Sequence, residues 1–297
     1  MDVPLRQSAA VRANAKINLT LDITGKREDG YHFMYMIMQS VDLADMVTVK
    51  LSDGDRIHVT CTGDPIEEEN NTAYRAANVF FTACEIAPRG LDIHIEKNIP
   101  MMAGMAGGSA DAAAVLTALD LMFGTELTHS ELCMMGAQVG ADVPFCLTGG
   151  TMVVEGIGEI FTPLPPLPEC YIVIAKPGDD MRTENSFQLY DELEFPPEDH
   201  PDNEQMFAAI VTGDLGEIAG CMYNVLEEVA PQEPVRRIKS VLMDCGALGA
   251  CMTGSGTATF GIFESKGDAK HAVRELSDIY DDVFLVEPAS CGVEVVE

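Results

Sequence analysis

The chain has 297 residues, of which 47% are hydrophobic, so it can bury a sizeable core in one large domain or two ordinary ones. Its formal net charge of −30, from 48 acidic and 18 basic residues, argues against a nucleic-acid-binding surface and against binding to anionic lipid. Its apolar runs fall short of the roughly 18 residues that span a membrane, and its first residues show no secretory signal. Nine scattered cysteines without a C-x-x-C pair are typical of small apolar fillers in a reducing cytoplasm.

The first half of the chain mixes segments of strand and helix periodicity. Enrichment in β-formers or alternation of apolar and polar residues predicts strands at residues 11–24, 46–51, 57–61, 91–95, 151–155 and 160–162. Apolar residues at helical spacing predict helices at residues 72–84, 110–123 and 130–139. Turn residues 52–54 between the second and third strands predict a hairpin, and Asn71 or Thr72 is expected to cap the first helix. Residues 140–144 are expected to form a short connection.

A cluster of prolines between residues 163 and 168 predicts a domain boundary, with domains at 1–162 and 163–297. Residues 191–204 are acidic and contain prolines, so we expect an exposed loop there. The same patterns as before predict strands at residues 171–175, 248–253, 258–263 and 283–287, and helices at residues 215–229, 235–246 and 267–277. Because strand pairs and helices are mixed rather than strictly alternating, the predicted fold class is α+β.

Residues 101–114, MMAGMAGGSADAAA, are the most informative stretch of the sequence. Gly104, Gly107 and Gly108 lead into a strongly helical run, and such a loop at a helix N-terminus forms a site for anions. The first N–H groups of a helix have no partner within it, the helix dipole is positive there, and glycine lets a phosphate approach the backbone. Since no Lys-Ser/Thr pair follows and no G-x-G-x-x-G occurs, the loop is neither a P-loop nor a dinucleotide fingerprint. A tight helix-packing contact of small residues explains the glycines equally well.

Asp142 and Lys16 are the candidates for acid–base chemistry. Asp142 lies in a tight connection among apolar neighbours, where a carboxylate usually needs a positive partner. Lys16 lies within a predicted strand, where a lysine must pair or extend to the surface, and Asn18 shares its face of that strand. Taken singly, Asp142 is more often a solvated turn residue, and Lys16 an edge-strand lysine that blocks aggregation.

Two further pairs of residues are candidates for contact with a ligand or a metal. Tyr31 and His32 follow a turn-like segment, so the ring of Tyr31 could stack on a base and His32 could hydrogen-bond its edge. A loop with a partly buried tyrosine is an equally good interpretation. Ser109 and Asp111, at the start of the predicted helix, are expected to cap it, with contact to a metal as the alternative.

Three motifs in this order resemble those of the GHMP small-molecule kinases. They are residues 15–19 (AKINL), residues 100–113 (ending in GGSADAA) and residues 252–258 (MTGSGTA). The resemblance covers nearly the whole chain and is weakest over residues 190–245. Within the superfamily, residues 25–32 (GKREDGYH) and 140–144 (GADVP) are similar to the branch that phosphorylates the 2-hydroxyl of a cytidine diphosphate-linked methylerythritol in the non-mevalonate isoprenoid pathway.

The resemblance implies a two-domain α+β fold with the active site in the cleft between the domains, and ATP and Mg²⁺ as cofactors. It implies that Asp142 takes or orients the proton of the acceptor hydroxyl, and that Lys16 keeps Asp142 ionised and stabilises the transferring charge. The implied ATP-binding loop consists of Pro100, Met101, Met102, Ala103, Gly104, Met105, Ala106, Gly107, Gly108, Ser109 and Ala110. The implied substrate residues are Asn18, Tyr31, His32, Thr183 and Phe187. In this arrangement Tyr31 and Phe187 enclose the cytosine ring.

The glycine loop departs from the family pattern at Met102, Ala103 and Ala106, where some members have glycine, and at Ala110, where a second serine is common. Ser109 alone is then left to serve the phosphates or Mg²⁺. Because no glutamate presents itself as a second ligand, the metal site stays undefined and phosphate and water are expected to supply most of its ligands.

Two alternatives remain open. One is a GHMP kinase for another alcohol, of the homoserine or mevalonate type, and the other is a non-catalytic nucleotide-binding protein of the same fold. The implied pathway indicates a bacterial cytoplasmic protein that acts on a small molecule, without a nucleic-acid or membrane partner, as a monomer or weak homodimer.

Overall fold

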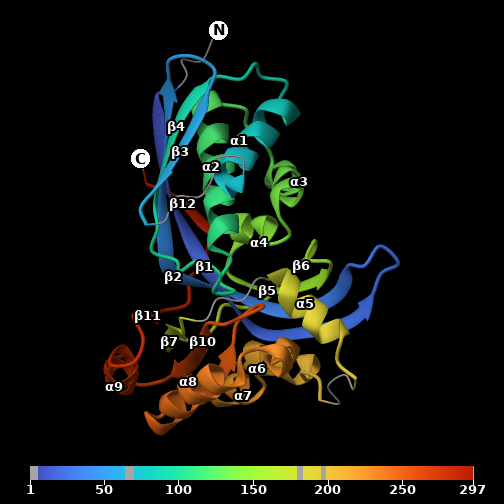
Figure 1. Cartoon of the computed structure of the whole chain (residues 1–297), viewed down its shortest axis with the longest axis vertical. Coiled ribbons are helices and arrows are strands. Elements are labelled where there is room, and N and C mark those ends of the chain that lie inside the picture. Colours follow the sequence, from blue (N-terminus) through green and yellow to red (C-terminus); the bar gives the residue numbers. More distant parts are fainter. Residues whose placement is uncertain (1–5, 64–69, 179–182, 195–198, 297) are drawn as a thin grey trace.

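A computed structural model describes residues 6–63, 70–178, 183–194 and 199–296, which form two β-sheets flanked by helices (Figure 1). The larger sheet has the order β12-β1-β2-β4-β3, with β5 on β2, β6 on β5 and β8 on β1. Its strands are β1 (Ser8–Lys26), β2 (His32–Ser52), β3 (Ile57–Cys61), β4 (Gly90–Glu96), β5 (Thr151–Gly156), β6 (Ile160–Pro163), β8 (Tyr223–Asn224) and β12 (Val293–Val295). The helices beside it are α1 (Thr72–Ala83), α2 (Gly107–Phe123), α3 (His129–Val139) and α4 (Val143–Thr148). The predicted α+β class is confirmed.

The smaller sheet has the order β11-β7-β10-β9, and its strands pair antiparallel. They are β7 (Tyr171–Lys176), β9 (Gly249–Met252), β10 (Thr259–Phe263) and β11 (Asp282–Val286). The helices of this part are α5 (Thr183–Asp191), α6 (Asn203–Thr212), α7 (Leu215–Gly220), the 3₁₀ helix η2 (Val225–Val229), α8 (Gln232–Asp244) and α9 (Lys266–Ser277). Both β8 and β12 pair with β1, so residues beyond the proline cluster contribute to the larger sheet as well. The division into 1–162 and 163–297 stays a prediction.

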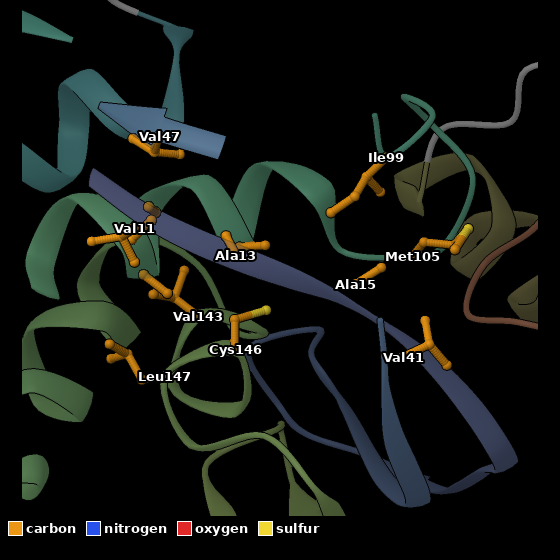
Figure 2. Close-up of a cluster of buried hydrophobic side chains, with 14 of the residues drawn as sticks. Val11, Ala13, Ala15, Val41, Val47, Ile99, Met105, Val143, Cys146 and Leu147 are labelled. Carbon is orange, nitrogen blue, oxygen red and sulfur yellow. The ribbon is translucent and has the colours of Figure 1, made fainter. Parts of the chain in front are cut away.

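Strand β1 lies inside the larger sheet and packs against the helix layer. Its core-facing residues, among them Val11 and Ala13, are fully buried in the same apolar cluster as Val143 and Leu147 of α4 (Figure 2). Each fully buried aliphatic side chain contributes roughly 1.5–3 kcal/mol to folding. The packing therefore fixes the strand that carries Lys16 and Asn18.

Local residues explain where α1, α2 and α4 begin. Asn71, one of the two caps that the sequence predicts, caps α1 by accepting a hydrogen bond from the backbone N–H of Ala73 at 2.9 Å. Helix α2 begins three residues before the prediction, so Gly107 lies in its first turn. Helix α4 begins within the connection predicted at 140–144, and Pro144 suits its second position because no backbone donor is needed there. No helix in the described part of the chain is both long and apolar enough to cross a membrane.

The predicted hairpin of residues 46–51 and 57–61 is wrong. Strand β4 lies between these segments, pairing antiparallel with β2 and parallel with β3. Leu91, Ile93 and Ile95 of β4 are almost completely buried, so this strand gains most from an inner position, whereas half-exposed β3 fits the edge. The prediction also misses the first part of β2, which pairs with β1 along most of its length. Methionines at 34, 36 and 38 alternate there with Phe33, Tyr35 and Ile37, so both faces are apolar and the usual alternation with polar residues is lost.

The predicted helix at residues 215–229 is also wrong. The structure has α7, then the short strand β8, then η2. Asn224 interrupts the helix, because its side chain accepts from the N–H of Leu226 and donates to the carbonyls of Met252 and Gly254. Helix α6, capped by Asp202, begins within the predicted loop at 191–204, of which residues 195–198 lie outside the described residues.

Candidate active site

A cavity of about 1010 Å³ collects nearly all the predicted site residues. Strand β1 contributes Lys16 and Asn18, the residue before α4 is Asp142, and the glycine loop contributes residues 100–109. The β1–β2 turn adds Tyr31 and His32, α5 adds Phe187, and the turn before β10 adds Gly254 and Ser255. Ala110 is absent from this lining because it is fully buried in α2, and the side chain of Thr183, the first residue of α5, lies outside the described residues.

The glycine loop directs the N-terminus of α2 toward this cavity. Ala106 is the N-cap residue in a left-handed conformation, with φ of 59°, and its side chain makes no capping hydrogen bond. The N–H groups of the first helical turn, at Gly107, Gly108 and Ser109, therefore have neither an intrahelical partner nor a side-chain cap. Together with the positive end of the helix dipole they form a site suited to phosphate oxygens.

The loop rests directly on the C-terminal glycine turn. Gly104 has a φ of +72°, and a Cβ at this position would lie 2.2 Å from the carbonyl oxygen of Thr253. In the reciprocal direction, a Cβ on Gly254 would lie 2.6 Å from the carbonyl oxygen of Gly104. Two of the three motifs that suggested the family therefore touch, and both glycines are required by the contact.

Gly104→Ala is expected to destabilise the protein by about 2–4 kcal/mol, because it combines a left-handed backbone with an overlap against Thr253. Chemical denaturation of the variant measures this loss. Gly178→Ala is the control, since a Cβ there meets no atom within 4 Å. Equal unfolding midpoints for the two variants would show that the loop does not rest on this turn in solution.

Lys16 is buried beneath the loop. Only 4% of the residue is exposed, and its Nζ donates a hydrogen bond to Oδ1 of Asn18 at 2.5 Å. Its backbone N–H donates to the carbonyl of Met105 at 3.2 Å, which ties β1 to the loop. Burial lowers the pKa of Lys16, and the negative charge of Asp142 acts against that shift. Asn18 is itself completely buried and its oxygen serves Lys16, so its predicted contact with substrate stays a prediction.

Asp142 is the N-cap residue of α4, yet its carboxylate makes no capping hydrogen bond. It is half-buried and lines the cavity, so the carboxylate is available to a ligand. In the described ranges no ion pair within 4.0 Å joins it to Lys16. The two residues share one cavity and influence each other through space, with Asn18 holding the lysine.

The predicted base-binding residues Tyr31, His32 and Phe187 line the cavity. Tyr31 is 63% exposed, so its ring is accessible to a ligand that stacks on it. Phe187 already stacks on His32, with ring centroids 5.1 Å apart and planes 19° from parallel. The predicted enclosure of a base between Tyr31 and Phe187 stays a prediction, and it would use the face of Phe187 that His32 leaves free.

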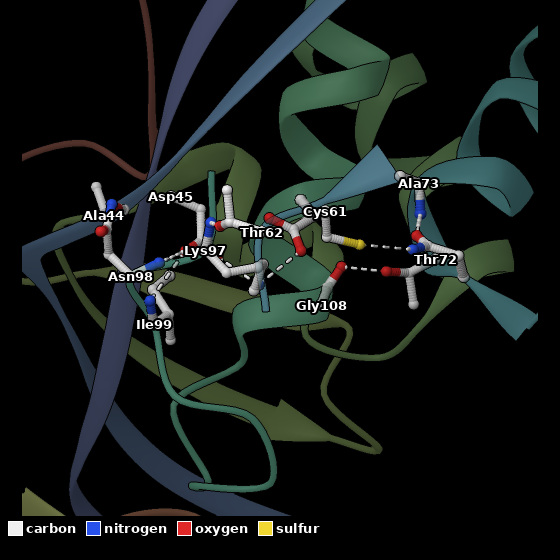
Figure 3. Close-up of polar contacts among 12 residues, drawn as sticks. Ala44, Asp45, Cys61, Thr62, Thr72, Ala73, Lys97, Asn98, Ile99 and Gly108 are labelled. Carbon is white, nitrogen blue, oxygen red and sulfur yellow. Dashed lines mark hydrogen bonds and ion pairs between the residues drawn. The ribbon is translucent and has the colours of Figure 1, made fainter. Parts of the chain in front are cut away.

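The expectation that Ser109 and Asp111 cap α2 is wrong, because the N-cap is Ala106 and no side chain caps the helix. Asp111 instead belongs to a buried charge cluster beside the loop, which sequence reasoning missed. Lys97, at the end of β4, donates to Asp45 at 2.5 Å and to Asp111 at 2.7 Å. Asp45 also accepts from the backbone N–H groups of Asn98 and Ile99, the residues that enter the loop (Figure 3). The cluster thus joins the start of the loop to the first turns of α2. A lysine that ends a half-buried strand directly before a glycine loop was the available signal.

Burial of Asp111 lowers the stability of the folded chain, and a substitution can measure this loss. One of its oxygens is buried without a partner, and burial, opposed by Lys97, raises its pKa to about 7. Between pH 4 and pH 7 the folded chain therefore holds a proton that the unfolded chain releases, so stability falls as the pH rises. Above pH 7 the full cost remains.

Asp111→Asn is accordingly expected to be more stable than wild type at pH 8, by on the order of 1–3 kcal/mol, with little difference near pH 4. Thermal unfolding at both pH values measures the difference in stability between the variant and wild type. The control Asp92→Asn, at an exposed position on β4, should have the stability of wild type at both pH values. A variant that is less stable at pH 8 would refute this interpretation of the cluster.

Comparison with known proteins agrees with this geometry. The family model for the GHMP kinases N terminal domain matches residues 71–150, and that for the GHMP kinases C terminal domain matches residues 206–282. A 4-diphosphocytidyl-2-C-methyl-D-erythritol kinase of Caldicellulosiruptor saccharolyticus is 44% identical over 278 residues, which cover 93% of this chain and 95% of that protein. The chain belongs to the 4-diphosphocytidyl-2-C-methyl-D-erythritol kinase family of the GHMP kinases. A relative with the same description from Alkaliphilus metalliredigens is 41% identical over 285 residues, covering 94% and 96%.

Solved structures place this kinase in the same fold. A crystal structure of 4-(cytidine 5'-diphospho)-2C-methyl-D-erythritol kinase matches with a TM-score of 0.78 and 31% identity, covering 94% of this chain and 99% of that one. A homoserine kinase from Cytophaga hutchinsonii matches with a TM-score of 0.77 and 20% identity, covering 99% of each chain, which shows the fold alone. The predicted GHMP kinase with an N-terminal and a C-terminal family domain is confirmed.

Proposed function

We propose that this kinase transfers the γ-phosphoryl group of ATP to the 2-hydroxyl of 4-diphosphocytidyl-2-C-methyl-D-erythritol. The observation that carries the proposal is that one cavity brings three kinds of group together. An anion site at the start of α2, the polar pair Lys16 and Asp142, and the aromatic residues Tyr31 and Phe187 all line it. These groups suit a triphosphate, a reacting hydroxyl and a pyrimidine base, respectively.

In the proposed step, the phosphates of ATP bind the N–H groups of the first turn of α2. The hydroxyl oxygen forms a bond to the γ-phosphorus, the bond from that phosphorus to the β-phosphate oxygen breaks, and ADP leaves. The proton of the hydroxyl passes to the carboxylate of Asp142. The ammonium of Lys16, held by Asn18, lowers the energy of the negative charge on the transferring group.

Mg²⁺ is proposed as the metal, since it neutralises phosphate charge in phosphoryl transfer. The described residues hold no group of three or more His, Cys, Asp or Glu side chains arranged around a metal position. This absence suits Mg²⁺, which keeps several waters and binds substrate phosphates with few protein ligands. Ser109, in the first turn of α2 and on the cavity wall, is the side chain proposed to assist.

We propose that the protein is a bacterial enzyme of the cytoplasm and that it is a monomer or a weak dimer. All nine cysteines are free thiols in the structure, which suits a reducing compartment. One relative with this description comes from the bacterium Clostridium tetani and is 41% identical to this chain over 278 residues.

Formation of ADP from ATP and Mg²⁺, with three alcohols compared at equal concentration, tests the proposal. The cytidine-linked methylerythritol should give turnover at least 100-fold faster than homoserine or mevalonate. Faster turnover with homoserine or mevalonate would assign another GHMP substrate. Binding of ATP without turnover on any of the three would favour a non-catalytic protein.

A further inference from the structure

Asp191, at the end of α5, connects that helix to the end of β1 and the start of β2 beside the cavity. Its Oδ2 accepts a hydrogen bond from Nζ of Lys26 at 2.6 Å, and its Oδ1 lies 2.8 Å from Nε2 of His32. Phe187, one helical turn earlier, stacks on the His32 ring. The side chain of His32 is only 9% exposed. Two contacts from α5 therefore fix the position of the imidazole.

The charge state of Asp191 decides which nitrogen of His32 carries a proton. Burial alone would raise the pKa of Asp191, but hydrogen bonds from Lys26 and His32 outweigh it and hold the pKa below its ordinary value. An ionised carboxylate can only accept hydrogen bonds, so Nε2 of His32 must donate. In the neutral ring Nδ1 then carries a lone pair and can only accept.

Nδ1 of His32 is left for a ligand. Nothing in the described ranges is hydrogen-bonded to it, although the side chain is more than nine-tenths buried. His32 and Asp191 both line the cavity. Nδ1 is not among the buried polar atoms that lack a partner, so on the cavity wall it is accessible to a donor from a bound molecule.

We propose that Asp191 is a positioning residue that holds His32 in its Nε2-protonated form, so that Nδ1 accepts a hydrogen bond from an amino group on the edge of the bound base. This inference rests on the proposed function, because it assumes that the cytidine end of the substrate binds here. Cytosine has an exocyclic amino group where uracil has a carbonyl oxygen. An acceptor at that edge binds the first and repels the second, so Asp191 makes the site select cytidine over uridine.

Calorimetric titration of CMP and UMP into the full chain tests this inference. We expect wild type to bind CMP at least tenfold more tightly than UMP. Asp191→Ala frees His32 to change tautomer, so CMP binding should weaken about tenfold while UMP binding stays within about twofold. Glu192→Gln, the control, changes a neighbouring carboxylate that contacts Gln188 and should keep the wild-type ratio.

The outcomes separate the inference from the proposed function. An unchanged ratio in Asp191→Ala, or equal weakening of both nucleotides, would overturn the positioning role. If wild type binds an ATP analogue but neither pyrimidine nucleotide, the proposed substrate fails and the inference with it. If wild type binds both nucleotides equally, the inference alone fails. Should Asp191→Ala not fold, Asp191→Asn replaces it, because an amide no longer dictates the tautomer and should also lower the ratio.

Discussion

Lys16→Met is expected to lose turnover by about 100- to 1000-fold while remaining at least as stable as wild type. The loss follows because the variant removes the cation that Asn18 holds in the cavity, and preorganised charge of this kind contributes strongly to phosphoryl transfer. The gain in stability follows because Lys16 is only 4% exposed and burial lowers its pKa. Methionine is of similar length and needs no solvation of a charge.

The difference in stability between Lys16→Met and wild type should depend on pH. Below its folded pKa, the buried ammonium costs stability, because the unfolded chain binds the proton more strongly. That cost is relieved as the pH rises toward the ordinary value of 10.5, so wild type should approach the variant in stability at alkaline pH.

The measurement is kcat together with thermal unfolding at pH 7 and pH 9. Lys50→Met, at an exposed position on β2, is the matched control and should change neither quantity. A Lys16→Met enzyme with wild-type turnover would contradict the role of the cation. A variant that has lost several kcal/mol of stability would instead show that Lys16 serves the fold.

Asp142→Asn should lower turnover by about 100- to 10,000-fold, because the amide cannot accept the proton of the substrate hydroxyl. ATP binding should change less than threefold, since the phosphates are held by the backbone at the start of α2. The fold should also be preserved, because the carboxylate makes no capping hydrogen bond at α4 that an amide would lose.

Steady-state kinetics and titration of an ATP analogue separate these effects. Asp278→Asn is the control, an exposed aspartate at the end of α9 and outside the cavity lining. If Asp142→Asn keeps wild-type turnover, the proton has another acceptor. If it loses ATP binding as well as turnover, Asp142 contributes to nucleotide binding and the assigned role is wrong.

Motifs that carry backbone requirements could be read from the sequence. Gly104 and Gly254 were placed correctly in glycine turns, because each motif permits few conformations, and the cap of α1 was narrowed to Asn71 or Thr72, of which Asn71 is the cap. The core face of β4 was also predictable, since Leu91 and Ile93 alternate with polar residues.

Features that depend on distant partners could not be read from the sequence. The position of β4 between β2 and β3 is decided by burial across three strands, and local turn residues do not report it. The break at Asn224 depends on the carbonyls of Met252 and Gly254. The Lys97 and Asp111 pair joins residues that a strand end and a helix start bring together. In each case tertiary contacts overrode a reasonable local pattern.

Phosphorus NMR of the product formed by wild type from ATP, Mg²⁺ and 4-diphosphocytidyl-2-C-methyl-D-erythritol tests the central proposal most directly. Carbon 2 of the substrate bears a methyl group and no hydrogen, so a phosphate on its hydroxyl has no proton three bonds away. The account predicts one new phosphomonoester signal that is not split by protons, with one ADP formed per product. No new phosphomonoester signal, or one split by carbon-bound protons, would contradict it.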